Sequence, residues 1–382
     1  MKLRIVVSGV NLTEMGPLAV FKDALESLSS RYGEEYEITA LVHRRSLFQI
    51  PNITYLEFPD IKSSWLKRLA FEFWKAKSIC DRIRPHLWLS MDNVTPNVTA
   101  PVVAVYCHNP SPFYRFRFRD LWLDWKFGLF TLFYRYLYAV NIGRNDHVIV
   151  QQDWIRKSFE RAYKVRNVIV AHPHVDAPKV GFDVRKRRSG EPYRFFYPAF
   201  PRTFKNVELI LAAAHLLEKG GFHDFELWLT LDSSVNRYAH GIVKRFGHVL
   251  SARWLGLLSR QQVFMRYAEA DCLLFPSKLE TWGLPITEFK ATGKPILAAN
   301  LPYAHETVGS YDQAAFFDPE NPAELADLMR AAADGKLPFA AVHSDPISSP
   351  YARDWDELWS LLLASKSTGM KLNETNRRLL DD

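Results

Sequence analysis

The sequence predicts an α/β protein with two doubly wound domains. Short apolar runs alternate with stretches of helical periodicity, a pattern typical of parallel sheets covered by helices. The 382 residues exceed the length of one ordinary domain. A turn-rich, charged stretch over 172–192 separates two halves that share this alternation. We therefore predict domains over 1–176 and 193–350, a linker over 177–192, and a closing segment over 351–382.

The composition is that of a globular protein in a reducing compartment. Hydrophobic residues make up 48% and charged residues 24% of the chain. Its three cysteines are widely spaced, so no disulfide framework and no metal-ligating Cys/His cluster is expected. The first ten residues lack the features of a signal peptide, which favours a cytoplasmic location. The net charge of +7 suits phosphate-bearing ligands, an anionic membrane or nucleic acid.

The first half opens with a strand, a turn and a helix. Residues 3–10 form an apolar run, 11–15 read as a loop, Gly16 as a flexible turn and Pro17 as a helix start. A strand, a glycine turn and a helix N-terminus together are a plausible cradle for an anion, although the motif alone is weak.

Further along, an apolar strand over 101–107 delivers His108 at its carboxyl end. The strand over 101–107 is preceded by predicted strands over 37–43, 53–58 and 87–90. Ligands of open α/β sheets bind outside the carboxyl ends of the strands, so His108 is a candidate site residue. The alternative is a histidine that only packs.

Two segments of the first half, 62–84 and 113–140, combine Lys and Arg with Trp, Tyr and Phe. Charges interrupt both before a membrane span can form, but this composition suits a helix lying on an anionic membrane surface. The alternative is a pair of core helices with solvated basic faces. We predict a peripheral protein on the inner face of the cytoplasmic membrane, contacting it through both segments.

The second half starts with a strand over 193–198 that is followed by two cations. Arg202 and Lys205 precede a helix that begins at residue 207, where both can reach a diphosphate. The alternative is that both are solvated loop cations. Strands over 226–230 and 252–255 follow, the latter ending in Gly256 and Leu257.

The most informative stretch is 275–306, which reads as a strand end, loop, short helix and strand. Gly283 permits a tight turn, Pro285 suits the first turn of a helix, and Gly293 with Pro295 ends it. Glu280 lies in the loop and Glu288 near the first turn of the helix. Because carboxylates only accept hydrogen bonds, we expect them to bind hydroxyl groups beside a phosphate at the helix N-terminus.

This stretch resembles the donor-site signature of the family 4 retaining glycosyltransferases of GT-B fold, of the bacterial polysaccharide type. The resemblance rests on Glu280-Thr-Trp-Gly-Leu-Pro-x-x-Glu288, Ala291-x-Gly293-x-Pro295 and Glu306. It implies two Rossmann-like domains facing across a cleft, with a closing helix over 353–365 that crosses back to the first domain. It also implies a metal-independent reaction without a cofactor, in which the donor is a GDP-, UDP- or dTDP-sugar.

The resemblance also implies roles for individual residues. Glu288 would hold the ribose, and Glu280 would orient the sugar hydroxyls, with Trp282 and Gly283 nearby. Backbone amides over Gly283, Leu284 and Pro285, with Arg202, Lys205 and Gly16, would meet the diphosphate. Gly256 and Leu257 would pack beside the nucleobase, and His108 would approach the sugar.

The function expected from this resemblance is transfer of a hexose of mannose or rhamnose type to a saccharide acceptor. We expect an acceptor linked to undecaprenyl diphosphate, used in surface polysaccharide or lipopolysaccharide synthesis. Two alternatives stay open: a nucleotide-sugar epimerase or hydrolase on the same fold, and a basic nucleic-acid-binding protein. The sequence lacks a recognisable nucleic-acid-binding motif, so we expect no nucleic-acid partner.

Overall fold

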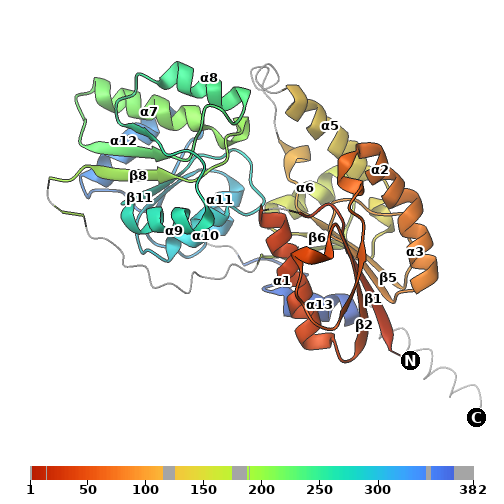
Figure 1. Cartoon of the computed structure of the whole chain (residues 1–382). Coiled ribbons are helices and arrows are strands. Elements are labelled where there is room, and N and C mark those ends of the chain that lie inside the picture. Colours follow the sequence, from red (N-terminus) through yellow and green to blue (C-terminus); the bar gives the residue numbers. More distant parts are fainter. Residues whose placement is uncertain are drawn as a thin grey trace, which may run out of the picture. The chain divides into compact units, whose positions relative to one another are not determined.

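The computed structural model describes residues 2–13, 15–114, 125–173, 187–188, 190–340 and 346–364. The chain divides into two compact units, which are described separately here (Figure 1). Unit 1 comprises Met1–Phe113, Thr131–His174 and Ile347–Asp382, and unit 2 comprises Tyr114–Phe130 and Val175–Pro346. Both are parallel-sheet α/β units of Rossmann-like type, which confirms the predicted fold class.

Within its described residues, unit 1 contains an eight-stranded sheet in the order β14-β7-β6-β5-β4-β1-β2-β3. Every neighbouring pair is parallel. The central strands β4 and β5 are buried along their whole length, as expected for a sheet covered on both faces. The strands are β1 (Leu3–Gly9), β2 (Tyr36–Val42), β3 (Ile53–Glu57), β4 (Leu87–Ser90), β5 (Val102–Cys107), β6 (His147–Val150), β7 (Val168–Ala171) and β14 (Tyr351–Ala352).

The described helices of unit 1 pack on this sheet (Figure 1). They are α1 (Met15–Tyr32), α2 (Trp65–Ala70), α3 (Ala76–Ile83), α5 (Trp125–Ala139) from Thr131 onward, α6 (Asp153–Tyr163) and α13 (Trp355–Ala364).

Helix α13 returns to unit 1 from the end of the chain, as the sequence predicted. Trp355, Leu358, Trp359 and Leu362 are buried in the same core cluster as β1 and α1. The carboxylate of Asp356 accepts a hydrogen bond from Ser27 Oγ at 2.6 Å and pairs with Arg31 at 2.7 Å. This helix is therefore part of the first core, although 172 residues of sequence lie between His174 and Ile347.

Two predicted elements of unit 1 differ in detail. Gly16 is the second residue of α1 and not a turn before it, because the helix already begins at Met15. The segment 62–84 is helical from Trp65 to Ile83, but a π-helical turn over Phe71–Lys75 separates α2 from α3. That turn directs the Glu72 side chain into the core, where it is 1% exposed.

Unit 2 contains, within its described residues, a six-stranded parallel sheet in the order β10-β9-β8-β11-β12-β13. Its strands are β8 (Tyr193–Tyr197), β9 (Phe225–Leu229), β10 (Ala252–Trp254), β11 (Cys272–Phe275), β12 (Ile296–Ala299) and β13 (Ala314–Phe317). Its described helices are α7 (Val207–Lys219), α8 (Arg237–Phe246), α9 (Arg260–Glu269), α10 (Leu284–Lys290), α11 (Pro302–Val308) and α12 (Pro322–Ala333).

The segment 113–140 is divided between the two units. Tyr114 and residues 125–130 group with unit 2, where the ring of Phe127 lies 5.3 Å from that of Phe204, and the segment belongs to unit 1 from Thr131 onward. Most of the predicted linker, and residues 115–124 of the segment 113–140, lie outside the described residues. The predicted domain boundaries therefore stay predictions.

Candidate functional site

The candidate site of unit 2 is built from the loops that follow β8 and β11. These strands are neighbours and run parallel, so their carboxyl ends lie at the same edge of the sheet. Backbone contacts join the two loops: the Lys278 amide donates to the Phe204 carbonyl at 2.7 Å. The Asn206 side chain, in a left-handed backbone conformation, donates to the carbonyls of Pro276 at 3.3 Å and Pro319 at 2.9 Å.

This edge brings Lys205 and Glu280 together across 75 residues of sequence. The ammonium of Lys205 lies 2.5 Å from Glu280 Oε1, and the two side chains are 19% and 14% exposed. The backbone of Lys205 is fixed as well, since the Tyr197 hydroxyl donates to its carbonyl at 3.0 Å. The Lys205–Glu280 ion pair therefore has a fixed orientation and is still accessible from solvent, at the edge of the sheet where ligands of such folds bind.

The Arg202 guanidinium does not take part in this ion pair. Its side chain is exposed and its guanidinium sits 5.3 Å from the centre of the Phe200 ring. The two cations predicted to act together thus differ: Lys205 is anchored, whereas Arg202 is held only by a ring contact among the described residues.

Glu288 is the fifth residue of α10 and faces α9. Its Oε2 accepts a hydrogen bond from the Tyr267 hydroxyl at 3.0 Å, and its Oε1 lies 3.7 Å from Arg260 Nη2. The side chain is 11% exposed, and this burial raises the pKa of the carboxyl group, while the Tyr267 hydroxyl and the Arg260 charge act in the opposite direction.

Neither partner of Glu288 was predicted from the sequence. Arg260 is the first residue of α9, directly after the helix-capping Ser259. Tyr267 is fully buried, and a buried tyrosine hydroxyl needs an internal partner. A tyrosine in the helix that leads into the buried strand β11 was the signal that could have found it.

The turn between β11 and α10 depends on Gly283. Its φ of +88° is in the left-handed region, and a Cβ here would lie 3.3 Å from Phe275 Cε1, so any other residue would be strained. The preceding Trp282 is buried, with its indole donating to Thr287 Oγ1 at 2.9 Å and its carbonyl accepting from the Thr307 hydroxyl. Leu284 and Pro285 form the first two residues of α10.

Gly256 and Leu257 follow the edge strand β10. Gly256 has a φ of +70°, and the Leu257 side chain is 54% exposed. This turn leads directly into Arg260, which reaches Glu288. Gly256 and Leu257, which are predicted to pack beside the nucleobase, therefore lie a few residues before Arg260. Arg260 in turn contacts Glu288, the carboxylate predicted to bind the ribose.

The two remaining predicted residues, Gly16 and His108, belong to unit 1. His108 follows β5, and burial lowers the pKa of its imidazole to about 4, so the ring is neutral near pH 7. Its backbone amide donates to Asn93 Oδ1 at 2.5 Å, and its ring packs 4.6 Å from that of Tyr106. Nε2 has no hydrogen-bond partner among the described residues.

The loop that leads to Gly16 is also held at this edge of the first sheet. Asp92, which follows β4, accepts hydrogen bonds from the backbone amides of Val10 at 2.9 Å and Asn11 at 3.0 Å. Across the described residues of both units, no group of three or more His, Cys, Asp or Glu side chains is arranged to hold a metal ion.

Comparison with known proteins agrees with the motif in unit 2. Residues 182–340 match the family model described as "Glycosyl transferases group 1". D-inositol 3-phosphate glycosyltransferase 1 of Catenulispora acidiphila is 28% identical over 98 residues, which cover 26% of this chain. The match spans 23% of the length of that curated relative.

Solved structures resemble the whole chain at low sequence identity. Sucrose-phosphate synthase from Thermosynechococcus elongatus has a TM-score of 0.64 at 14% identity, with 100% of both chains covered. The lipopolysaccharide outer core galactosyltransferase WaaB also has a TM-score of 0.64, at 13% identity, covering 96% of this chain and 100% of its own. Anabaena Alr3699/HepE, solved with UDP-glucose, has a TM-score of 0.60 at 14% identity, covering 98% and 100%. The chain thus has the GT-B fold, and its residues 182–340 match the glycosyl transferases group 1 domain.

Proposed function

We propose that the chain is a retaining, metal-independent glycosyltransferase that moves a hexosyl group from a nucleotide-diphosphate sugar to a saccharide acceptor. The observation that carries the proposal is the Lys205–Glu280 ion pair at the carboxyl edge of the unit 2 sheet, within the stretch that matches the family model and that also holds Glu288. The relative solved with UDP-glucose supports a nucleotide-sugar donor.

Donor binding would rearrange the Lys205–Glu280 ion pair. The diphosphate carries more negative charge than one carboxylate, so it would draw the Lys205 ammonium to itself. Glu280 would then be released to accept hydrogen bonds from hydroxyls of the transferred sugar. Glu288, as a carboxylate, would accept hydrogen bonds from the ribose hydroxyls.

The reaction exchanges one bond to the anomeric carbon for another. The bond from this carbon to the donor phosphate oxygen breaks, and a bond to the acceptor hydroxyl oxygen forms on the same face. The acceptor proton passes to the departing phosphate oxygen. Lys205 would stabilise the negative charge that develops on that phosphate, with Arg202 as a second, exposed cation. The role of His108 at the sugar stays a prediction.

The first test is a thermal-shift panel of GDP-, UDP- and dTDP-sugars, followed by a transfer assay with the stabilising donor. Glu280→Ala should abolish transfer while the melting temperature without donor changes little. Wild-type turnover in this variant would contradict the assigned role. Donor consumption at the same rate without any acceptor would favour the epimerase or hydrolase alternative instead. The anomeric configuration of the product, read by NMR, decides retention.

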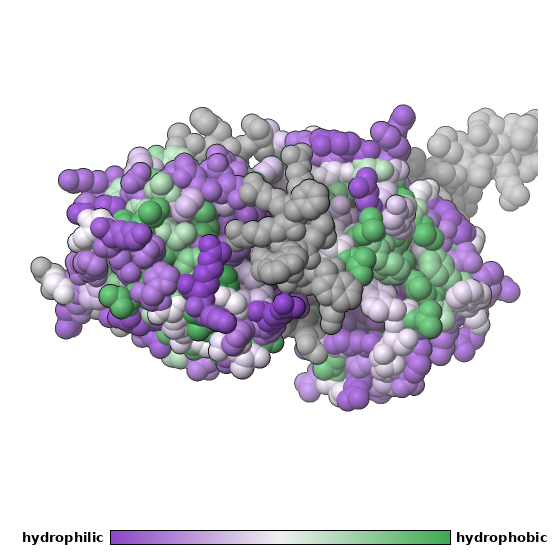
Figure 2. All heavy atoms as spheres, turned by 90° about the horizontal axis from the view of Figure 1, so that it is seen from above, coloured by the Kyte–Doolittle hydropathy of each residue, from purple (hydrophilic) through white to green (hydrophobic). Residues whose placement is uncertain are grey.

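We further propose that the acceptor is lipid-linked and that the protein acts at an anionic membrane surface. Exposed apolar side chains gather where α2 and α5 lie, on the face of unit 1 seen from above in Figure 2. These are Trp65, Leu66, Leu132, Phe133, Tyr136 and Val140. The rings of Trp65 and Phe133 lie 5.1 Å apart, so the two helices form one surface.

The surrounding charges and a relative support this second proposal. Lys67 is exposed on α2, and Lys75 is exposed in the π-helical turn that follows it. The structurally similar WaaB is a lipopolysaccharide outer core galactosyltransferase. No helix within the described residues is long and apolar enough to span a membrane.

A further inference from the structure

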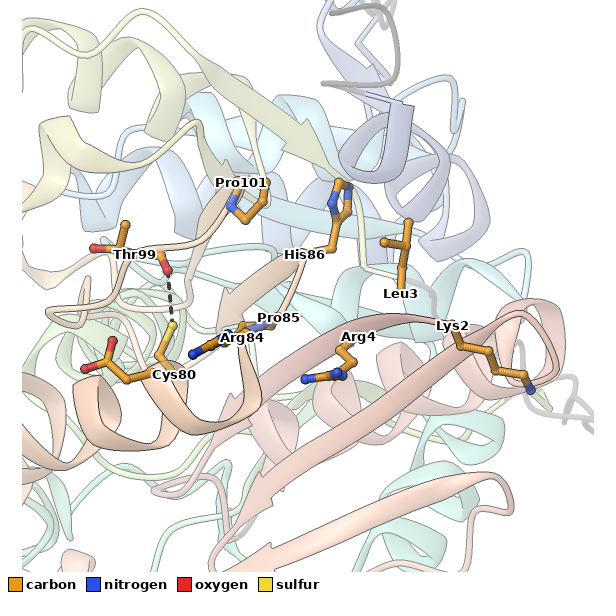
Figure 3. A pocket seen from close by; sticks show the side chains of 10 residues that line it. Lys2, Leu3, Arg4, Cys80, Arg84, Pro85, His86, Thr99 and Pro101 are labelled. Atoms are coloured by element: carbon orange, nitrogen blue, oxygen red, sulfur yellow. Dashed lines mark hydrogen bonds between the residues drawn. The ribbon is translucent and has the colours of Figure 1, made fainter. Parts of the chain in front are cut away.

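A cavity of about 700 Å³ lies at the amino edge of the unit 1 sheet. It is lined by the start of β1, the end of α3 and the segments that lead into β4 and β5, as Figure 3 shows. Its volume is within the range of pockets that hold small molecules. Because His108 and the loop held by Asp92 follow the carboxyl ends of the same strands, the cavity lies at the opposite edge of the sheet from them.

The lining is strongly cationic. Lys2, Arg4 and Arg84 contribute positive charges, and Asp81 is the acidic residue of the lining. The Asp81 carboxylate is already matched by Lys77, 2.8 Å away on α3. Three cations around one small cavity repel one another unless an anion lies between them.

Arg4 has an acidic partner, whereas Lys2 and Arg84 have none among the described residues. Arg4 pairs with Glu37 at 3.3 Å, and its Nη1 donates to the Ile83 carbonyl, which fixes the guanidinium beside the end of α3. For Lys2 and Arg84, no side-chain hydrogen bond or ion pair occurs within the described part of the chain. In Figure 3 the Arg4 and Arg84 side chains extend in the same direction, whereas the Lys2 ammonium points away from both.

The backbone holds Arg84 at this place against its own preference. Arg84 ends α3 with φ 51° and ψ 60°, in the left-handed region, and Pro85 follows it. A residue before proline favours extended backbone, and left-handed backbone favours glycine or asparagine. The buried Pro85 and the Arg84 amide, which donates to the Cys80 carbonyl at 2.7 Å, keep this conformation. An arginine is therefore not required here by the turn itself.

We propose that this cavity binds a phosphate-bearing small molecule, with the guanidinium of Arg84 as its main contact, Arg4 beside it and Lys2 adding positive charge to the lining. Guanidinium groups match phosphate oxygens in charge and geometry. Leu3, which is 49% exposed, and the exposed Pro101 offer an apolar wall for the rest of the ligand. This site is separate from Lys205, Glu280 and Glu288, and it does not depend on the proposed transfer reaction.

The test is calorimetric titration with inorganic pyrophosphate at constant ionic strength. All variants carry Lys205→Ala, which weakens binding at the candidate donor site in unit 2. Arg84→Asn removes the guanidinium at a position where asparagine fits the backbone better, so the melting temperature should stay the same or rise. Arg82→Gln is the matched control, because it removes one positive charge from the same helix end but does not line the cavity.

Arg84→Asn should weaken pyrophosphate binding about tenfold or more, as expected for a lost charge-assisted contact. Lys2→Gln should weaken it less, because its ammonium points away from the two guanidinium groups, and Arg82→Gln should leave it unchanged. Equal affinities of the Arg84 and Arg82 variants would overturn the proposal, as would an unchanged affinity in both lining variants. In a Lys205 wild-type background, Arg84→Asn should leave sugar transfer intact, which separates this result from a failure of the proposed function.

Discussion

The ionisation of Glu288 is governed by its immediate neighbours. Burial raises the pKa of this carboxyl group, and the Tyr267 hydroxyl opposes that rise by hydrogen bonding to the carboxylate. Tyr267→Phe removes this bond, so the pKa of Glu288 should increase further. If Glu288 must be ionised to hold the donor, the acid limb of the kcat/KM profile should move up by about one pH unit.

A control for this change is Tyr311→Phe. The Tyr311 hydroxyl donates to the Lys294 carbonyl at 2.6 Å, so its removal also costs a hydrogen bond in unit 2 but touches no carboxylate. The acid limb should stay in place in this variant. An identical pH profile for both variants would remove Tyr267 from its role as the positioning residue of Glu288.

Glu72 links stability to pH. It is 1% exposed, and neither carboxyl oxygen has a hydrogen-bond partner among the described residues. Burial and the nearby Asp92 raise its pKa well above the ordinary value, although Arg68 opposes this. The raised pKa therefore favours the folded state fully at a pH below the ordinary glutamate pKa of about 4.3, where Glu72 is neutral. This stabilisation is lost as the pH rises through the raised pKa of the folded state.

Glu72→Gln should consequently stabilise the protein near pH 8, by about 1–3 kcal/mol in the free energy of unfolding. The amide is neutral at every pH, so the advantage should shrink as the pH falls toward 4. Denaturant unfolding of both proteins across this pH range measures the difference. If the stability gained by Glu72→Gln grew as the pH fell, the pKa of Glu72 could not be raised in the folded state.

At the level of elements, the turn into α10 is predicted to be intolerant of substitution. Gly283→Ala places a Cβ at a φ of +88° and 3.3 Å from Phe275 Cε1. The expected loss is about 1–2 kcal/mol for the left-handed backbone. Gly241→Ala is the matched control, because Gly241 lies within α8 with open space around it and should gain about 0.5–1 kcal/mol. Similar melting temperatures for the two variants would refute the argument.

Helix α13 is predicted to be essential for the first core. Trp359 is fully buried, and its indole donates to the Ala24 carbonyl of α1 at 3.2 Å. Trp359→Ala should cost about 3–5 kcal/mol by cavity formation. Leu361→Ala on the exposed side of the same helix should cost far less, since that side chain is 37% exposed. Equal losses, measured by denaturant unfolding, would show that α13 does not dock as described.

The elements that the sequence predicted well are those with strong local signals. Strands such as β4 and β5 are continuous apolar runs, which only a sheet covered on both faces can bury. The π-helical turn over Phe71–Lys75 and the two-residue strand β14 have no such signal. Strand β14 exists because Tyr351 and Ala352 pair with β7, about 180 residues earlier in the sequence.

The candidate site shows the same division. Glu280 and Glu288 were found because they stand in a local motif, and Lys205 because it precedes a helix. That Lys205 pairs with Glu280, and that Tyr267 and Arg260 contact Glu288, follows from the order of strands in the sheet. Spacing along the chain does not encode such contacts, so the fold was needed to reveal them.

At the scale of the whole molecule, the exposed apolar surface on α2 and α5 predicts binding to anionic vesicles. Trp65→Ser with Leu132→Ser should reduce co-sedimentation with vesicles rich in acidic phospholipid, because both side chains are exposed there. Binding of the wild type should fall at high salt, since the basic residues also contribute. Leu250→Ser, an exposed leucine of unit 2, is the control. Equal binding by all three proteins would contradict membrane contact through this surface.

The return of α13 to unit 1 has a consequence for how the protein is made. The ribosome synthesises the chain from its amino end. Strand β14 and helix α13 of unit 1 therefore emerge only after nearly all of unit 2 has been synthesised. The second core can close before the first one is complete. Nascent unit 1 therefore exposes the apolar groove that Trp355, Leu358 and Trp359 later fill, and this interval is when chaperones would have most reason to engage it.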